Sequence, residues 1–219
     1  MEESRETKKT SAPAVEEKQK LKNQKEEVPF FHYLGIYKTL DPEEIAARCR
    51  LPFEERAFAL RLVGTEYRIP FPDFALGDAP MAEKILILRY LCGGRSVAPR
   101  GKQVAYQEIP WGNVYYQNFQ GRCILRFART FGSDLEAFRR VMAFLQAEPL
   151  PQSDAGYRFE FIPGLSMSLL LWAGDEEFSP SGQILFDDNF EFAFTAEDIA
   201  VVGETVLRRL KILSAQNSF

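Results

Sequence analysis

The strongest constraint on this chain is a pair of neighbouring apolar segments with the spacing of β-strands. Residues 156–162, with the sequence GYRFEFI, alternate aromatic side chains with Arg158 and Glu160. Such alternation is typical of a strand with one buried face. A Pro163-Gly164 turn follows, and residues 165–173 return as a nearly continuous apolar run, which favours a central strand. The two segments predict a hairpin inside a sheet.

Other periodic segments place this hairpin in a mixed fold. Because the strand signals cluster instead of alternating with helices, we expect an α+β fold. It would have an antiparallel sheet of about five strands with helices packed on one face. Ser133 is expected to cap one helix together with Glu136. The expected helices are 31–40, 42–49, 81–92, 113–131, 134–147 and one that starts after Thr195, and the expected strands also include 55–64, 66–71, 184–187 and 190–194.

The first 27 residues differ in composition from the rest of the chain. They contain seven Glu residues, seven Lys or Arg residues and almost no large apolar side chains. Such a segment cannot bury enough apolar surface to offset the conformational entropy it would lose on folding. We therefore expect residues 1–27 to form a disordered charged leader and residues 28–219 to form a single α+β domain.

Charge, hydropathy and cysteine usage exclude several classes of protein. The formal net charge is −4, whereas nucleic-acid binding requires a basic face. The N-terminus lacks the apolar core of a secretory signal, and residues 165–173 are about half of the ~20 residues that span a bilayer. Cys49, Cys92 and Cys123 are widely separated, which indicates reduced thiols. We expect a cytoplasmic protein without nucleic-acid or membrane partners.

An acidic loop follows the central strand and is one candidate site. Asp175, Glu176 and Glu177 come after the strand 165–173, and Asp187 and Asp188 come after the next short strand. If both groups lie at one rim of the sheet, the five carboxylates could bind a hard cation or act as general acid and base. The alternative is that they cap turns, Asp175 and Asp187 in particular. No metal-binding or phosphate-binding motif accompanies them, so the sequence specifies no cofactor.

A second candidate lies on the helix expected at 113–131. Tyr115 and Tyr116 precede Arg122 by about two helical turns, so a hydroxyl and a guanidinium group would share one side of the helix. Arg122, Arg126 and Arg129 form a basic stripe that either receives an anion or is a solvated face paired with acids. His32 is the only histidine, and we expect it to serve packing or the surface.

Three segments resemble a known family. They are ILILRYL at 85–91, GNVYYQNFQGR at 112–122 and LLLWAGDEEFSPSGQILFDDN at 169–189. Together they resemble the bacterial and archaeal domain-of-unknown-function family DUF3786, over about residues 36–210. The resemblance implies a domain common in anaerobes, with some members fused to an iron–sulfur domain, and so an accessory role near anaerobic redox or corrinoid one-carbon metabolism. No activity comes with the family, and this chain lacks a cysteine run that could hold a cluster.

Two functions follow as hypotheses. The first is a non-enzymatic binding or accessory module for a small-molecule ligand or a protein partner, and the second is a carboxylate-based hydrolase or transferase with a divalent metal. A homo-oligomer is a further alternative, and the sequence leaves the oligomeric state open. The candidate ligand-binding residues are Tyr115, Tyr116, Arg122, Trp172, Asp175, Glu176 and Glu177.

Overall fold

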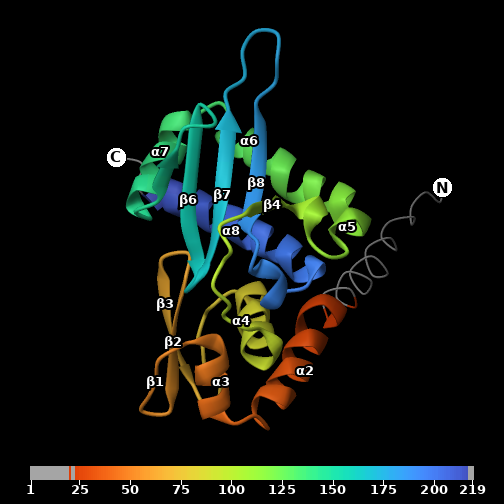
Figure 1. The fold of residues 1–219 in the computed structure, drawn as a ribbon, viewed down its shortest axis with the longest axis vertical. Coiled ribbons are helices and arrows are strands. Elements are labelled where there is room, and N and C mark those ends of the chain that lie inside the picture. The colour runs from red at the N-terminus through yellow and green to blue at the C-terminus, as the bar shows by residue number, and fades with distance from the viewer. Residues whose placement is uncertain (1–19, 21–22, 217–219) are drawn as a thin grey trace, which may run out of the picture.

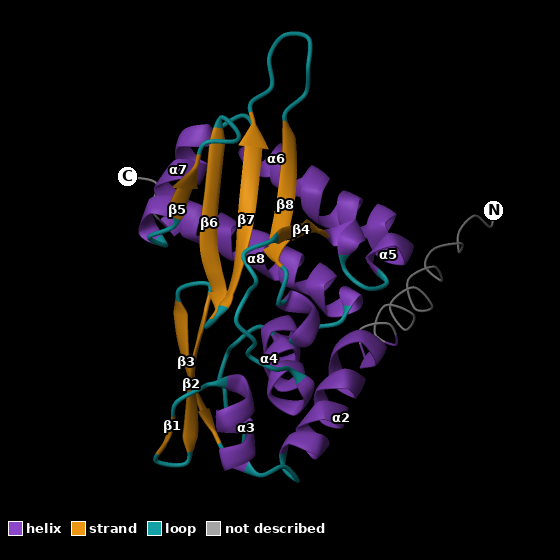
Figure 2. Ribbon diagram, in the orientation of Figure 1, coloured by secondary structure: helices purple, strands orange, loops and turns teal. Residues whose placement is uncertain are grey.

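A computed structural model of the chain describes residue 20 and residues 23–216 (Figures 1 and 2). Most of the expected leader, residues 1–19 and 21–22, lies outside the described residues. Asn23–Glu27 form a π-helical turn that continues into α2. The α-helices are α2 (Val28–Tyr37), α3 (Pro42–Cys49), α4 (Met81–Gly93), α5 (Gly112–Phe119), α6 (Leu125–Phe131), α7 (Leu135–Phe144) and α8 (Ala196–Gln216).

The main sheet has five antiparallel strands in the order β4-β8-β7-β6-β5. The hairpin expected from the sequence forms its centre, where Phe159 of β6 pairs with Met167 of β7. β7 in turn pairs with β8, which begins earlier than expected, at Ser181. The strands are β4 (Gln103–Ala105), β5 (Glu148–Leu150), β6 (Ala155–Ile162), β7 (Leu165–Trp172) and β8 (Ser181–Asp187).

Helices pack on one face of this sheet, as the sequence predicts (Figure 2). The rings of Phe138 in α7 and Tyr157 in β6 lie 5.6 Å apart, and those of Phe119 in α5 and Phe186 in β8 lie 6.1 Å apart. The alternate residues of the strands point to the opposite face. There Arg158 of β6 forms a 2.6 Å ion pair with Asp187 of β8. The fold class is therefore α+β with an antiparallel sheet.

Two local expectations were wrong. The strand expected at 190–194 is a 3-10 turn, Phe190–Phe192. Its apolar and polar residues alternate, but the turn places Phe190 and Phe194 together in the core, where both rings contact Phe161. The cap of α7 is Asp134 instead of Ser133, because the Asp134 carboxylate accepts a hydrogen bond from the backbone N–H of Ala137.

The long helix expected at 113–131 is divided by a π-helical turn, Gln120–Ile124. Gly121 lies in this turn. A π-helical turn inserts one residue into the helical repeat, so the residues before and after it no longer share one face. For this reason the basic stripe expected from Arg122, Arg126 and Arg129 does not continue along one regular helix.

A second, three-stranded sheet with the order β1-β2-β3 lies next to the main one. Its strands β2 (Ala57–Leu62) and β3 (Thr65–Pro70) form the hairpin predicted at 55–71, and β1 (Phe53–Glu54) extends it. The backbone N–H of Val63 donates to the carbonyl of Phe161 in β6 at 2.9 Å. This bond joins the two sheets.

A buried ionic cluster, which we call the seam, holds the small sheet to the helices. The carboxylate of Glu83 in α4 is fully buried. It accepts hydrogen bonds from the Tyr67 hydroxyl of β3 at 2.6 Å, from Arg209 Nε of α8 at 2.9 Å and from Arg208 of α8 at 3.1 Å. Each of the three elements therefore contributes to one charge-assisted network.

Candidate functional site

A groove runs between two groups of elements. Helices α2 and α4 form one side, and α5, α8 and the loops before them form the other. Arg89 of α4 and Asp198 of α8 form an ion pair, and both residues line the space on either side of it. The pair therefore divides the groove into a first cleft and a second cleft. Each cleft has a volume of about 480 Å³, within the size range of small-molecule sites.

The bridging pair is held by further contacts. Arg89 forms a 2.7 Å ion pair with Asp198, whose side chain is 5% exposed. The Arg89 guanidinium also lies 5.1 Å from the centre of the Tyr33 ring in α2, a cation–π distance. Asp198 accepts hydrogen bonds from both the backbone N–H and the hydroxyl of Thr195, which caps α8 as the sequence predicts. Burial raises the pKa of Asp198 above its ordinary value, although Arg89 and Thr195 act in the opposite direction.

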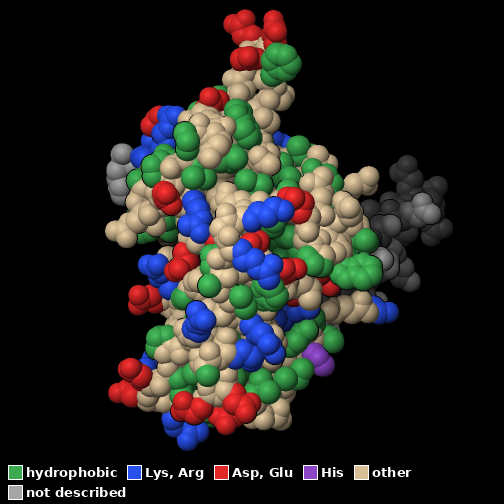
Figure 3. Space-filling model, viewed as in Figure 1, with side chains coloured by type: hydrophobic (Ala, Val, Ile, Leu, Met, Phe, Trp, Pro, Cys, Tyr) green, Lys and Arg blue, Asp and Glu red, His purple; other side chains and the backbone are tan. Residues whose placement is uncertain are grey.

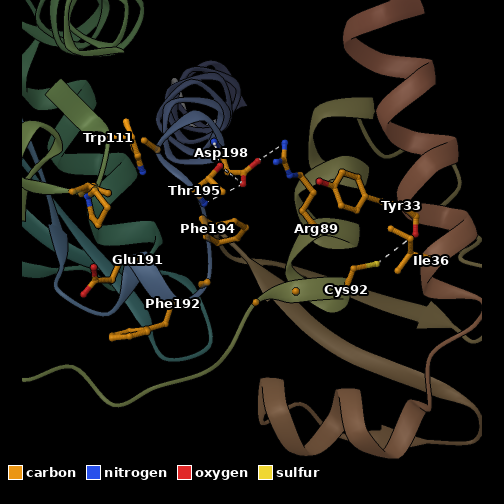
Figure 4. Close-up of a pocket in the computed structure, with 16 residues that line it drawn as sticks. Tyr33, Ile36, Arg89, Cys92, Trp111, Glu191, Phe192, Phe194, Thr195 and Asp198 are labelled. Atoms are coloured by element: carbon orange, nitrogen blue, oxygen red, sulfur yellow. Dashed lines mark hydrogen bonds and ion pairs between the residues drawn. The ribbon is translucent and has the colours of Figure 1, made fainter. Parts of the chain in front are cut away.

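The walls of the first cleft come from distant parts of the chain (Figure 4). Tyr33, Ile36 and Cys92 stand on the α2 and α4 side, next to Arg89. Trp111, Glu191 and Phe192 stand on the opposite side, beyond Asp198 and Thr195. The lining therefore combines aromatic and aliphatic surface with a small number of polar groups, which is the usual composition of a ligand pocket.

Trp111 lies at the edge of this cleft and is one of seven described non-glycine residues with a left-handed backbone conformation. Its φ of 68° is left-handed, and its side chain is 79% exposed. The next residue has to be glycine, because a Cβ on Gly112 would lie 1.8 Å from the carbonyl oxygen of Tyr106. A left-handed backbone costs about 1–2 kcal/mol in a residue that has a side chain. The fold thus accepts strain in order to display an indole ring at the cleft.

The second cleft contains two of the candidate residues named from the sequence. Tyr115 and Arg122 both line it, so the structure brings this pair together. The Arg122 guanidinium donates two hydrogen bonds to Glu204 of α8, at 2.6 and 2.5 Å, and a third to Asn118 at 3.1 Å. The hydrogen bonds to Glu204 raise the pKa of Arg122. Arg122 is therefore already paired with a carboxylate of its own chain.

The other candidate residues lie elsewhere. Tyr116 is half-buried and packs against the core. Trp172 ends β7 and is half-buried. Asp175, Glu176 and Glu177 lie in the exposed loop that joins β7 to β8 and projects beyond the sheet (Figures 1 and 3). Of the seven candidates, two line the groove, Tyr116 packs against the core, and the other four lie at the end of β7 and in the β7–β8 loop.

The acidic loop uses its first carboxylate to hold its own backbone. Asp175 Oδ1 accepts hydrogen bonds from the backbone N–H groups of Glu177 and Phe178 at 2.9 and 2.7 Å, and the backbone N–H of Asp175 donates to the Phe178 carbonyl. Asp175 is therefore a turn-capping residue, which was one of the two alternatives predicted. Figure 3 shows the acidic side chains and one apolar side chain gathered at this tip, where Phe178 is 69% exposed.

The expectation that five carboxylates share one rim of the sheet was wrong. Asp175 follows the end of β7, whereas Asp187 ends β8, and these strands are antiparallel. The ends of neighbouring antiparallel strands lie at opposite edges of a sheet. Asp187 is buried and paired with Arg158, and Asp188 accepts a hydrogen bond from the backbone of Arg100. Over residues 20 and 23–216, no three His, Cys, Asp or Glu side chains are close enough together to hold a metal ion.

The three cysteines are poor nucleophiles in this environment. Burial raises the pKa of Cys49 to about 11, that of Cys92 to about 11 and that of Cys123 to about 12. A thiol with so high a pKa is almost entirely protonated at neutral pH, whereas the thiolate is the reactive form. Cys123 also packs against Gly203 of α8 and donates to the Ala200 carbonyl. These thiols are free and serve packing.

Sequence reasoning missed the residues that define the groove, although two signals were present. Arg89 is the one charged residue within the apolar run ILILRYL, and a lone arginine in a buried helix needs a partner. Thr195 and Asp198 have the spacing of a capping box at the start of α8. Neither signal shows that Arg89 pairs with Asp198, because these two residues lie on helices that are far apart in the sequence.

Comparison with known proteins gives a family and no function. A family model described as a domain of unknown function, DUF3786, matches residues 41–209. No curated protein and no solved structure matches the chain. Among the described helices, none has both the length and the apolar character needed to cross a membrane.

Proposed function

We propose that this chain, which belongs to the DUF3786 family, is a binding or accessory module that takes a small, partly apolar ligand into the first cleft. The observation that carries the proposal is Trp111. This residue is 79% exposed beside a cleft of about 480 Å³, on a backbone with a φ of 68°. Strained residues cluster at ligand sites, where the surrounding structure maintains them for a purpose other than stability.

The rest of the lining supports a binding role. Tyr33, Ile36 and Phe192 supply apolar surface, and the bridging pair of Arg89 and Asp198 supplies fixed polar groups. Burial of a ring between such walls contributes most of the affinity of a small ligand, while a few polar groups fix its orientation. The link to anaerobic redox or corrinoid metabolism, implied by the family resemblance, stays a prediction.

The alternative of a carboxylate-based hydrolase or transferase finds less support. Two carboxylates have to face one bond if they are to act as acid and base. In this fold Asp175 and Asp187 lie at opposite ends of the β7–β8 hairpin, and each is engaged by its own neighbours. Asp198 is the most deeply buried carboxylate at the groove, and its ion pair with Arg89 makes it part of the scaffold.

The proposal can be tested with the two tryptophans of the chain. In protein labelled with ¹⁵N, the two indole N–H signals are assigned with the Trp111→Phe variant. Three probes of similar shape are then titrated: benzyltrimethylammonium, benzyl alcohol and phenylacetate. At least one probe should shift the Trp111 signal in a saturable manner and leave the Trp172 signal in place. If no probe moves the Trp111 signal, or if both indoles respond equally, the proposal is wrong.

A variant that fills the cleft provides the second arm. Gly93 lines the first cleft, and a Cβ added there meets no atom within 4 Å. Gly93→Leu should therefore abolish the saturable shift without disturbing the fold. Gly121→Leu is the matched control, since its Cβ also meets no atom within 4 Å and it lies in the π-helical turn away from the cleft. Equal binding by both variants would contradict the proposal.

A further inference from the structure

The charges along the groove are unequally paired. Its two basic residues are both neutralised, Arg89 by Asp198 and Arg122 by Glu204. Its other acidic residues are Glu26 and Glu197 in the second cleft and Glu191 in the first. Among the described residues, these three carboxylates form neither an ion pair nor a side-chain hydrogen bond. Every uncompensated charge on the lining is therefore negative.

The helix ends at the first cleft do not offset this excess. The N-terminus of α8 is already capped by Asp198. The last carbonyls of α4 accept hydrogen bonds from Arg48, which reaches Leu91 O at 2.6 Å and also Gly94 O. A helix dipole acts on a ligand mainly through the unpaired groups of its last turn. The exposed carboxylate of Glu191 is therefore the main unpaired charge on the wall of the first cleft.

Two exposed aromatic residues lie on the same side of the cleft as this carboxylate. Figure 4 shows Trp111 and Phe192 on the same side of the cleft as Glu191, and their side chains are 79% and 37% exposed. The face of an aromatic ring attracts cations, and indole does so most strongly. One such contact exists on the opposite side of the cleft, where the guanidinium group of Arg89 lies over the ring of Tyr33.

We infer that the ligand of the first cleft is an organic cation, a primary or quaternary ammonium group on an apolar body. Its charged group would lie near the Glu191 carboxylate, on the side of the cleft that carries Trp111 and Phe192. The bridging arginine would not repel it strongly, because Asp198 neutralises Arg89. An inorganic cation does not fit, since the described residues offer no cluster of three ligating side chains. This inference rests on the proposed function and adds the charge of the ligand.

The same three probes test the inference, because they differ mainly in charge. Benzyltrimethylammonium should bind at least about tenfold more tightly than phenylacetate, with benzyl alcohol between them. Glu191→Gln should weaken binding of the cation several-fold and leave that of benzyl alcohol unchanged. Glu176→Gln, at the tip of the acidic loop, is the matched control and should change the affinity of neither the cation nor benzyl alcohol.

The outcomes separate the inference from the proposed function. The ligand is not a cation if phenylacetate binds as tightly as benzyltrimethylammonium, or if Glu191→Gln changes neither the affinities of the probes nor the order of these affinities. The cleft is still a binding site in that case. If no probe shifts the Trp111 signal, both conclusions are overturned. A cation preference that survives Gly93→Leu would place the binding outside the first cleft and would also overturn the inference.

Discussion

The seam and the groove each contain a buried carboxylate paired with arginine, but the two are built differently. Glu83 in the seam is 0% exposed and receives hydrogen bonds from Tyr67, Arg208 and Arg209. Asp198 in the groove is 4% exposed, has the single arginine partner Arg89, and borders two clefts. One carboxylate is enclosed by its partners, and the other has open space beside it.

The difference shows how the same ionic chemistry can serve two purposes. A fully enclosed carboxylate stabilises a fold only while every partner is present, because an unpaired buried charge is costly. A carboxylate with one partner at the edge of a cavity leaves room for a ligand, and water in the cavity can solvate the pair. We therefore expect changes in the seam to affect stability and changes in the groove to affect binding.

The largest effect is expected in the seam. Glu83→Gln removes the negative charge and leaves Arg208 and Arg209 facing a neutral amide, so it should reduce the free energy of unfolding by about 3–5 kcal/mol. Urea denaturation followed by far-UV circular dichroism measures this change. Glu44→Gln on the exposed surface of α3 is the control and should stay near the wild-type value. A loss below about 1 kcal/mol would show that the seam is not a stabilising network.

A change of opposite sign is expected beside the first cleft. Trp111→Gly removes an exposed ring and gives the left-handed position the residue that adopts it most easily, so the free energy of unfolding should rise by about 1 kcal/mol. Binding of the aromatic probes should be lost in the same variant. Trp111→Ala keeps the backbone strain and should lose binding without the gain in stability. A fall in stability for Trp111→Gly would mean that the ring supports the fold.

A small, pH-dependent effect is expected for Asp198. Asp198→Asn retains a carbonyl oxygen for Thr195, so it should cost about 1 kcal/mol or less at pH 7. Because the pKa of Asp198 is raised from 3.8 in the folded protein, the native state binds this proton more tightly than the unfolded state does. The wild type should therefore gain stability relative to the variant as the pH falls from 7 towards 3.8. If the difference in unfolding free energy between the wild type and the variant does not change with pH, this expectation is wrong.

The smallest effect is expected at the acidic loop. Asp175→Asn keeps an oxygen that can accept from the backbone N–H groups of Glu177 and Phe178, so the midpoint of unfolding should not change measurably. Asp175→Ala removes this cap and should loosen the turn. Amide hydrogen exchange at Glu177 and Phe178 should then become faster. Unchanged exchange in the alanine variant would show that the cap does not hold the loop.

The strands and helices could be predicted to the extent that their patterns are local. The alternation in β6, the apolar run of β7 and the helix expected at 42–49 each follow from a few adjacent residues, and each is present in the structure. The strand β5 was not predicted, because it has three residues and contains Pro149. The turn at Phe190–Phe192 was misassigned because alternation over three residues does not distinguish a strand from a 3-10 turn.

The candidate site was predictable only in part, because it is made of distant residues. Tyr115 and Arg122 lie on consecutive helical segments, so their shared cleft could be inferred from spacing. Arg89 and Asp198 meet through the packing of α4 on α8, which no local pattern encodes. Trp172 and Asp175 stood out in the sequence through their composition, but the hairpin places them at the end of the sheet away from the groove.

The long sequence separation between α4 and α8 has a consequence for biosynthesis. Arg209 pairs with Glu83 across 126 positions, and Asp198 of the same helix completes the groove. While α8 is still inside the ribosome, the emerging chain would hold Glu83 and Arg89 without their partners. Domains fold as units once their sequence is available. The seam and the groove should therefore form only after α8 has left the ribosome.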